Sequence, residues 1–167
     1  MSDATSLQTL QVLENIVFLK KTPLFSAVQT RELRAVAMIA SEISYAPGET
    51  IVKEGDVGDT LYVIKWGAVS ITKKISETSA VELATLSQGE FFGDMSVFDA
   101  EVRSASVAAK PQCLLLRISG DDLKEVIVDN PCIAIELLRT FVKRLRSANS
   151  TIETLSRRDR QNGARTQ

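Results

Sequence analysis

The spacing of apolar residues changes at Ser41, and this change constrains the fold more than any other feature of the sequence. From Ser41 to Ile118 the chain is a series of short apolar segments with a period of two. The expected strands are 43–46, 50–53, 61–65, 69–72, 81–86, 106–109 and 113–118. Glycine, proline and aspartate separate these segments, as at Pro47 and Gly48. Many short strands at close spacing predict a small sandwich or roll of antiparallel strands.

Two helices are expected before this region. Leu7, Leu10, Leu13 and Val17 recur at helical spacing, and residues 30–39 repeat the pattern after a proline. The stripe on the first helix has two interpretations. It packs against the core of its own domain, or it contacts a partner or a preceding region of a longer polypeptide.

A long helix is expected after the strands. Ser119 suits the cap of a short helix that ends near Asp129, and Asn130 and Pro131 suit the cap and first position of the next one. The apolar seam of that last helix is Ala134, Leu138, Phe141, Leu145, Ala148, Ile152 and Leu155. Three heptads of this spacing are typical of a coiled coil, so the seam either packs on its own strands or forms a parallel two-fold homodimer.

Composition excludes several classes of function. The 167 residues fit one domain, and 20 basic against 21 acidic residues give no basic field for nucleic acid or a membrane surface. The sequence shows no membrane-length apolar run and no signal sequence, so we expect a cytoplasmic protein. It contains no histidine, which excludes a His-rich metal site and every Ser-His or Cys-His nucleophile. We therefore expect neither an enzyme nor a bound metal.

The residues suited to ligand chemistry gather in one stretch, FFGDMSVFDAEVRSASVAA at 91–109. Gly93 allows a ligand to approach the backbone, and the N–H groups of Asp94, Met95 and Ser96 would begin a helical turn directed at an anion.

Charged and hydroxyl side chains complete this pattern. The fork of Arg103 matches phosphate oxygens, and Ser104 adds a hydroxyl donor. Asp94 would repel a phosphate, so in contact with the ligand it would accept hydrogen bonds from a sugar hydroxyl. The same residue types are also typical of an ordinary solvated turn.

The stretch resembles the phosphate-binding cassette of the cyclic nucleotide-binding domain family, in which F-G-E, a short helix and a loop precede R-S/T-A. Here Arg103, Ser104 and Ala105 supply the last part. Further similarity lies in LKKTPLF at 19–25, PGE at 47–49, KEGDVGDTLYVI at 53–64, WGAVSI at 66–71 and NPCIAIELLRTFVKRLR at 130–146. The last of these resembles the long helix after the barrel in transcription factors of the catabolite activator type. The resemblance covers about residues 18–155.

The resemblance implies an α+β, mainly β fold: an eight-stranded antiparallel, jelly-roll-like β-roll with flanking N-terminal helices and a long C-terminal helix. The expected divisions are a helical segment at 1–17, the roll at 18–129, the helix at 130–156 and a disordered basic tail at 157–167. The last helix forms the dimer in the catabolite activator type, which favours a homodimer here. A protein partner or a larger polypeptide is also expected, and nucleic-acid or membrane contact is not.

The implied function is a regulatory module that binds cAMP, or alternatively cGMP, and signals by moving its C-terminal helix. The implied ligand-binding residues are Gly93, Asp94, Met95, Ser96, Arg103, Ser104, Ala105 and Asn149. Arg103 would pair with the cyclic phosphate, and Ser104 would bond the phosphate or the base. Asn149 would reach the base, because Ala148 beside it has no polar group.

One residue departs from the family pattern. Asp94 stands where the family usually has a glutamate that accepts a hydrogen bond from the ribose 2′-OH. Loss of that bond would cost about 1.5–3 kcal/mol, or about ten- to a hundred-fold in affinity. Two alternatives follow: a structural or protein-interaction module that has lost nucleotide binding, and a fragment of a transcription regulator.

Overall fold

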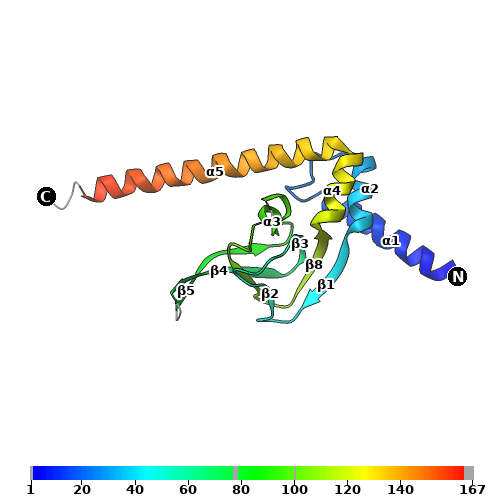
Figure 1. The fold of residues 1–167 in the computed structure, drawn as a ribbon, viewed down its shortest axis with the longest axis horizontal. Coiled ribbons are helices and arrows are strands. Elements are labelled where there is room, and N and C mark those ends of the chain that lie inside the picture. The colour runs from blue at the N-terminus through cyan, green and yellow to red at the C-terminus, as the bar shows by residue number, and fades with distance from the viewer. Residues whose placement is uncertain (1, 77–78, 100, 164–167) are drawn as a thin grey trace.

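The computed structural model describes residues 2–76, 79–99 and 101–163, with side chains described from residue 6 to residue 150 within these ranges. The described strands form two four-stranded antiparallel sheets (Figure 1). One sheet has the order β1 (Ser41–Tyr45), β8 (Cys113–Ser119), β3 (Thr60–Trp66), β6 (Phe91–Phe92). The other has the order β2 (Thr50–Val52), β7 (Ser106–Ala109), β4 (Ala68–Ser76), β5 (Ser79–Ser87). The predicted antiparallel β-roll is therefore confirmed.

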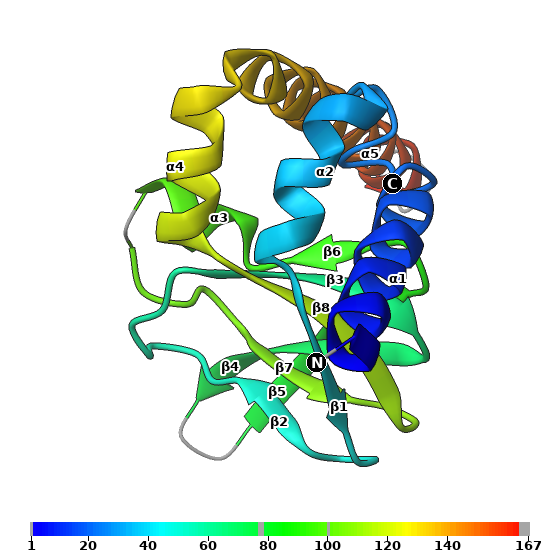
Figure 2. The ribbon, with the colours of Figure 1, turned by 90° about the vertical axis from the view of Figure 1, so that its right-hand side faces the viewer.

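The helices lie together on one side of this roll (Figure 2). They are α1 (Ser2–Leu19), α2 (Thr30–Ile39), α3 (Asp94–Asp99), α4 (Gly120–Asp129) and α5 (Pro131–Gly163). Leu33, Leu123 and Ile133 bring α2, α4 and α5 into one buried cluster with Leu116 and Ile118 of β8. Among the described helices, none is both long enough and apolar enough to cross a membrane.

A second buried cluster fills the roll between its two sheets. Ile64 and Leu115 contribute from one sheet, and Val69 and Val107 from the other. The short strand β6 pairs with Tyr62 and Val63 of β3. It was not predicted, because a two-residue strand gives no alternation to detect. The pairing holds the start of the predicted cassette firmly against β3.

The first helix packs on the core with the side opposite its predicted apolar stripe. Leu7, Leu10, Leu13 and Val17 are 54–67% exposed, while Val12, Ile16 and Leu19 pack on the core cluster. Of the two interpretations of this stripe, packing against the domain's own core is therefore wrong, and contact with a partner or a preceding region stays a prediction. Both sides of this helix are apolar, so spacing alone could not show which side is buried.

The last helix extends far from the body (Figure 1). It continues to Gly163, beyond residue 156 where its end was expected and into the segment predicted as a disordered tail. Its arginines and glutamines favour helix, and no proline or glycine interrupts it before Gly163. In the predicted seam, Leu138 and Leu145 are about 60% exposed, so these two do not pack on their own strands. The side chains of Ile152 and Leu155 lie outside the described residues.

Candidate functional site

A buried arginine lines a pocket formed by β6, α3, the segment that leads into β7 and one side of α5. The side chain of Arg103 donates a hydrogen bond of 3.0 Å to the Thr60 carbonyl and one of 3.3 Å to the Gly93 carbonyl. Arg103 is only 6% exposed, yet no carboxylate of the described residues forms an ion pair with it. A guanidinium has five N–H donors, so donors remain for another acceptor. A buried cation without a carboxylate partner favours an anionic ligand.

The loop between β2 and β3 holds the main chain of this arginine. The Arg103 N–H donates to the Asp56 carbonyl at 2.9 Å, and the Gly55 N–H donates to the Arg103 carbonyl at 2.9 Å. Gly58 lies against the guanidinium, since a Cβ at that position would stand 3.1 Å from its Nε. The KEGDVGD loop and the R-S-A segment, distant in sequence, therefore form one structural unit.

Gly93 allows the cassette to turn close to β3. Its φ is +83°, which L side chains rarely adopt, and a Cβ would stand 2.4 Å from the Thr60 carbonyl oxygen. That added carbon would also stand 2.8 Å from Nη1 of Arg103. Only glycine allows both the tight turn and the contact with the arginine.

The main chain of Ser104 is fixed by a lysine of β4. Lys73 Nζ donates to the Ser104 carbonyl at 2.6 Å and pairs with Glu54 at 3.2 Å. The backbone N–H of Lys74 and the side chain of Lys73 bond the Glu54 carboxyl and hold its pKa below its usual value. This network orients the rim of the pocket, and it was not predicted from the sequence, because Glu54, Lys73 and Ser104 lie far apart in the chain.

Asp94 links the pocket to α5. Its carboxylate accepts a 3.0 Å hydrogen bond from Arg144, whose guanidinium also lies 4.7 Å from the centre of the Phe91 ring. Burial raises the pKa of Asp94, while Arg144 and the N–H groups of Asp94 and Met95 act in the opposite direction.

The structure brings seven of the eight predicted residues into one cavity of about 150 Å³. Those seven are Gly93, Asp94, Met95, Ser96, Arg103, Ser104 and Ala105. Val52, Ile71 and Val107 form an apolar wall, and Arg144 closes one side. Asn149 is exposed on α5 and does not line the cavity, so its contact with a ligand stays a prediction. The described residues contain no cluster of three metal-ligating side chains.

Comparison with known proteins agrees with this geometry. The sequence model of the family "cyclic nucleotide-binding domain" matches residues 42–130. This chain belongs to that family. The match begins in β1 and ends just before α5, so the domain includes both sheets and the whole cassette.

The similar proteins include a transcriptional regulator and a protein kinase. The "CRP-like cAMP-activated global transcriptional regulator" of Mycobacterium tuberculosis is 28% identical over 82% of this chain and 61% of its own length. The "cGMP-dependent protein kinase, isozyme 1" of Drosophila melanogaster is 34% identical over 72% of this chain but only 16% of its own length. The crystal structure of the Thermus thermophilus catabolite activator protein superposes with a TM-score of 0.72. The two sequences are 31% identical, and the match covers 81% of this chain and 63% of that one. The chain thus spans about three fifths of the two bacterial proteins.

The cavity is lined by the predicted cassette, which includes α3, together with side chains of β2, β4, β7 and α5. The sequence identified the cassette because its residues lie close together in the chain. It missed Arg144, which stands 50 residues from Asp94 and reaches the pocket only through the packing of α5. An arginine on a helix carries no local signal for such a contact.

Proposed function

We propose that this domain is a regulatory module, not an enzyme, and that it binds a cyclic mononucleotide, with cAMP as the first candidate and cGMP as the second. The observation that carries the proposal is Arg103, a buried cation in a cavity with no ion-pair partner among the described residues. A cyclic phosphate supplies one negative charge and oxygens that a guanidinium fork can bind. The cost of burying the cation is then offset by the ligand.

Each remaining part of the pocket suits a different part of the nucleotide. Asp94 accepts a hydrogen bond from the ribose 2′-OH, because its carboxylate lies at the beginning of α3 beside the cavity. Ser104 donates its hydroxyl to the phosphate or the base. The apolar wall of Val52, Ile71 and Val107 suits the uncharged part of the ligand.

Occupancy acts on α5 through Arg144. This residue joins α5 to the cassette through Asp94, and both residues line the cavity. A bound nucleotide places a hydroxyl on Asp94 and a phosphate in the same cavity, so Arg144 has different partners in the two states. A ligand shifts a conformational equilibrium only through such differential contacts.

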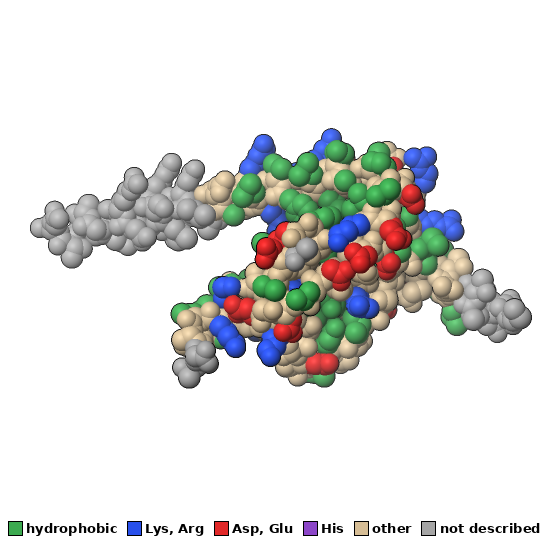
Figure 3. All heavy atoms as spheres, in the orientation of Figure 1, with side chains coloured by type: hydrophobic (Ala, Val, Ile, Leu, Met, Phe, Trp, Pro, Cys, Tyr) green, Lys and Arg blue, Asp and Glu red, His purple; other side chains and the backbone are tan. Residues whose placement is uncertain are grey.

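The exposed seam of α5 suits a homodimer. Figure 3 shows hydrophobic side chains along the described part of α5. Leu138 and Leu145 are exposed on it, and Phe141 packs edge to face on Phe98 of α3 at 5.9 Å. A parallel pair of α5 helices would cover this seam and place it beside both cassettes. In a longer polypeptide, the module would pass nucleotide binding on to an attached domain, as in a transcription regulator.

Calorimetric titration of the purified chain with cAMP, cGMP and 5′-AMP tests the proposal. We expect dissociation constants of about 1–50 µM for at least one cyclic nucleotide and binding at least about ten-fold weaker for 5′-AMP, whose phosphate is not cyclic. The two cyclic ligands, compared directly, identify the preferred base. A folded sample that gives no heat with any of them would favour the second candidate, an interaction module. The Asp94–Arg144 ion pair supports that candidate, since it already uses the carboxylate that the ribose requires.

A further inference from the structure

The first helix presents an apolar stripe to solvent, here called the α1 ridge: Leu7, Leu10, Leu13 and Val17. Its members are 54–67% exposed and lie on the side of α1 opposite Val12, Ile16 and Leu19. A helix that is apolar on both sides is usually buried on both sides. One side of α1 is covered by its own domain, and the ridge is uncovered among the described residues.

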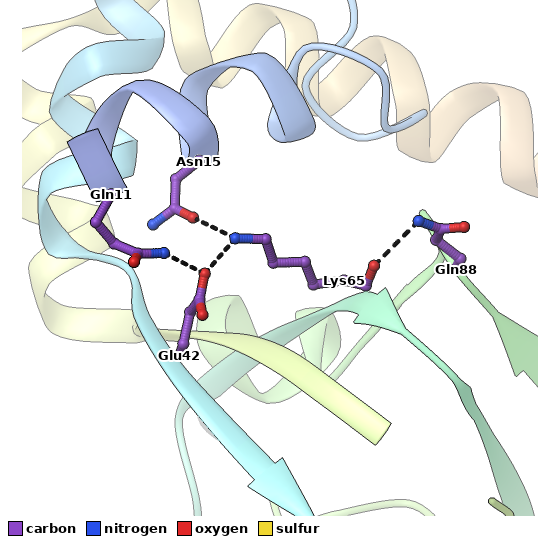
Figure 4. A network of polar contacts seen from close by, with 5 residues as sticks. All are labelled: Gln11, Asn15, Glu42, Lys65 and Gln88. Atoms are coloured by element: carbon purple, nitrogen blue, oxygen red, sulfur yellow. Dashed lines mark hydrogen bonds and ion pairs between the residues drawn. The ribbon is translucent and has the colours of Figure 1, made fainter. Parts of the chain in front are cut away.

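The buried side of α1 is locked in place by a polar network (Figure 4). Lys65 of β3 bonds the amide oxygen of Asn15 at 3.3 Å, and Asn15 is only 1% exposed. Lys65 and Gln11 both bond the same oxygen of Glu42 in β1. Helix α1 therefore cannot roll to bury its ridge without leaving these groups unpaired.

A groove of about 400 Å³ runs beside the ridge. Leu13, Val17 and Phe18 make it apolar, while Glu14 and Lys21 stand at its edge. On the other side of Leu13, α1 and α2 enclose a second groove of about 350 Å³ whose rim carries Arg34 and Met38. A ridge between two grooves has the shape that fits a second helix of the same kind.

The charges at the first groove favour a second copy of this chain as the occupant. Glu14 and Lys21 form no ion pair among the described residues of their own chain. They lie on opposite sides of Val17, three and four residues away. In an antiparallel pair related by a two-fold axis near Val17, Glu14 of each copy faces Lys21 of the other. Such a self-complementary patch is what a two-fold contact requires.

We propose that two copies associate through α1, antiparallel and about a two-fold axis near Val17, with each ridge seated in the other's groove. We expect one helix from each copy to bury less than the roughly 800 Å² per partner of a standard stable interface, so the association should lie in the micromolar range. Helices α1 and α5 extend from the body in different directions (Figure 1). The α1 contact is therefore separate from the α5 seam, and a chain that used both would form assemblies larger than a dimer.

Sedimentation equilibrium of the full chain tests this contact. The starting variant carries Leu138→Asp and Leu145→Asp, two exposed positions that remove the α5 seam. We expect a monomer–dimer equilibrium with a dissociation constant of about 10–100 µM, weakened at least about ten-fold by Val17→Asp. Val17 is exposed in the single chain, so this change should leave the fold and nucleotide binding intact.

A charge exchange tests the antiparallel register. Glu14→Lys alone and Lys21→Glu alone each place like charges together and should weaken the dimer about three- to ten-fold. Together, the two changes restore the pair and should return the dissociation constant to within about two-fold of the starting value. A starting variant that stays monomeric at about 300 µM, or a dimer unaffected by Val17→Asp, would overturn the proposal. The proposal would also be overturned if the double charge variant dimerised no more tightly than the single variants.

Discussion

Asp94 of the cassette and Arg144 of α5 form a 3.0 Å ion pair across the mouth of the pocket, and Arg144 also lies over Phe91. Together these contacts dock α5 onto the ligand site. A partly exposed ion pair contributes about 0.5–1 kcal/mol, so Arg144→Ala should speed amide exchange in residues 141–148 by about two- to five-fold without nucleotide. Hydrogen exchange measured by mass spectrometry gives this value directly.

Arg139→Ala is the matched control for that experiment, because Arg139 pairs with Glu136 on α5 and does not line the pocket. It should leave exchange at 141–148 nearly unchanged. Adding nucleotide should alter exchange there in the native chain and much less in Arg144→Ala. If nucleotide changed hydrogen exchange at 141–148 equally in the native chain and in Arg144→Ala, the proposal that Arg144 transmits ligand binding to α5 would be contradicted.

The length and charge of the side chain at position 94 should determine the affinity for cAMP. Asp94→Glu extends the carboxylate by one methylene toward the ribose and keeps a charge for Arg144, so cAMP binding should tighten. Asp94→Asn removes the charge and should weaken binding about ten- to a hundred-fold, as expected for a lost charge-assisted hydrogen bond. Both effects are measured by calorimetric titration. No change in either variant would mean that the ribose does not use this residue.

Nucleotide binding should depend on pH through Asp94. Burial raises the pKa of this carboxyl above its ordinary 3.8 in the free protein. Only the ionised form can accept the ribose hydroxyl with both oxygens, so binding releases a proton once the free carboxyl is protonated. Affinity for cAMP should be constant near neutral pH and then fall, by at most about ten-fold per pH unit, as the pH passes down through that raised pKa.

Asp94→Asn supplies the control for this pH profile, because its side chain does not titrate. Titrations from about pH 7 down to about pH 4.5 should show a decline in the native chain and a nearly flat profile in the variant. Identical profiles would assign the titration to another group.

Gly89 and Gly93 both have a positive φ, but only Gly93 lies close to other atoms. Alanine substitutions at the two positions therefore distinguish the cost of backbone strain from the cost of a steric clash. Gly89 has a φ of +86° and no atom within 4 Å of an added Cβ, so Gly89→Ala should cost only about 1–2 kcal/mol. Gly93→Ala adds a contact of 2.4 Å to the Thr60 carbonyl and should cost more than about 3 kcal/mol. Urea unfolding measures both values.

The same pair of variants should differ in ligand binding. Gly93→Ala displaces Arg103 and should abolish cAMP binding, while Gly89→Ala, outside the cavity lining, should retain it. If the two variants were equally stable and bound equally well, the close approach of Gly93 to Thr60 would have no role in the site.

The sequence predicted the fold well because strand alternation and glycine turns are local signals. Seven strands appear near their predicted places, and α2 matches residues 30–39. Local signals failed at the helix caps. Ser119 precedes α4 but makes no side-chain cap hydrogen bond, and the side-chain amide of Asn130 donates back to Val126 in α4. Which hydrogen bonds these two side chains form depends on the packing between helices.

The site was predictable in part for the same reason. The cassette is contiguous, so its residues could be named from the sequence and do line one cavity. The contacts of Arg144 and Lys73 depend on which elements meet in three dimensions. The sequence left two interpretations of the α1 stripe open, since Leu13 and Ile16 are both apolar and only the fold decides which of them faces solvent.

The most direct test of the central claim is calorimetric titration of cAMP into Arg103→Ala and Arg103→Lys, with Arg117→Ala as control. Arg117 is exposed on β8, away from the cavity, so its removal should leave affinity unchanged. Unfolding curves establish that each variant is folded. We predict that Arg103→Ala loses detectable binding and that Arg103→Lys binds about ten- to a hundred-fold more weakly, because lysine keeps the charge without the fork. Native affinity in a folded Arg103→Ala variant would contradict a phosphate site built on this arginine.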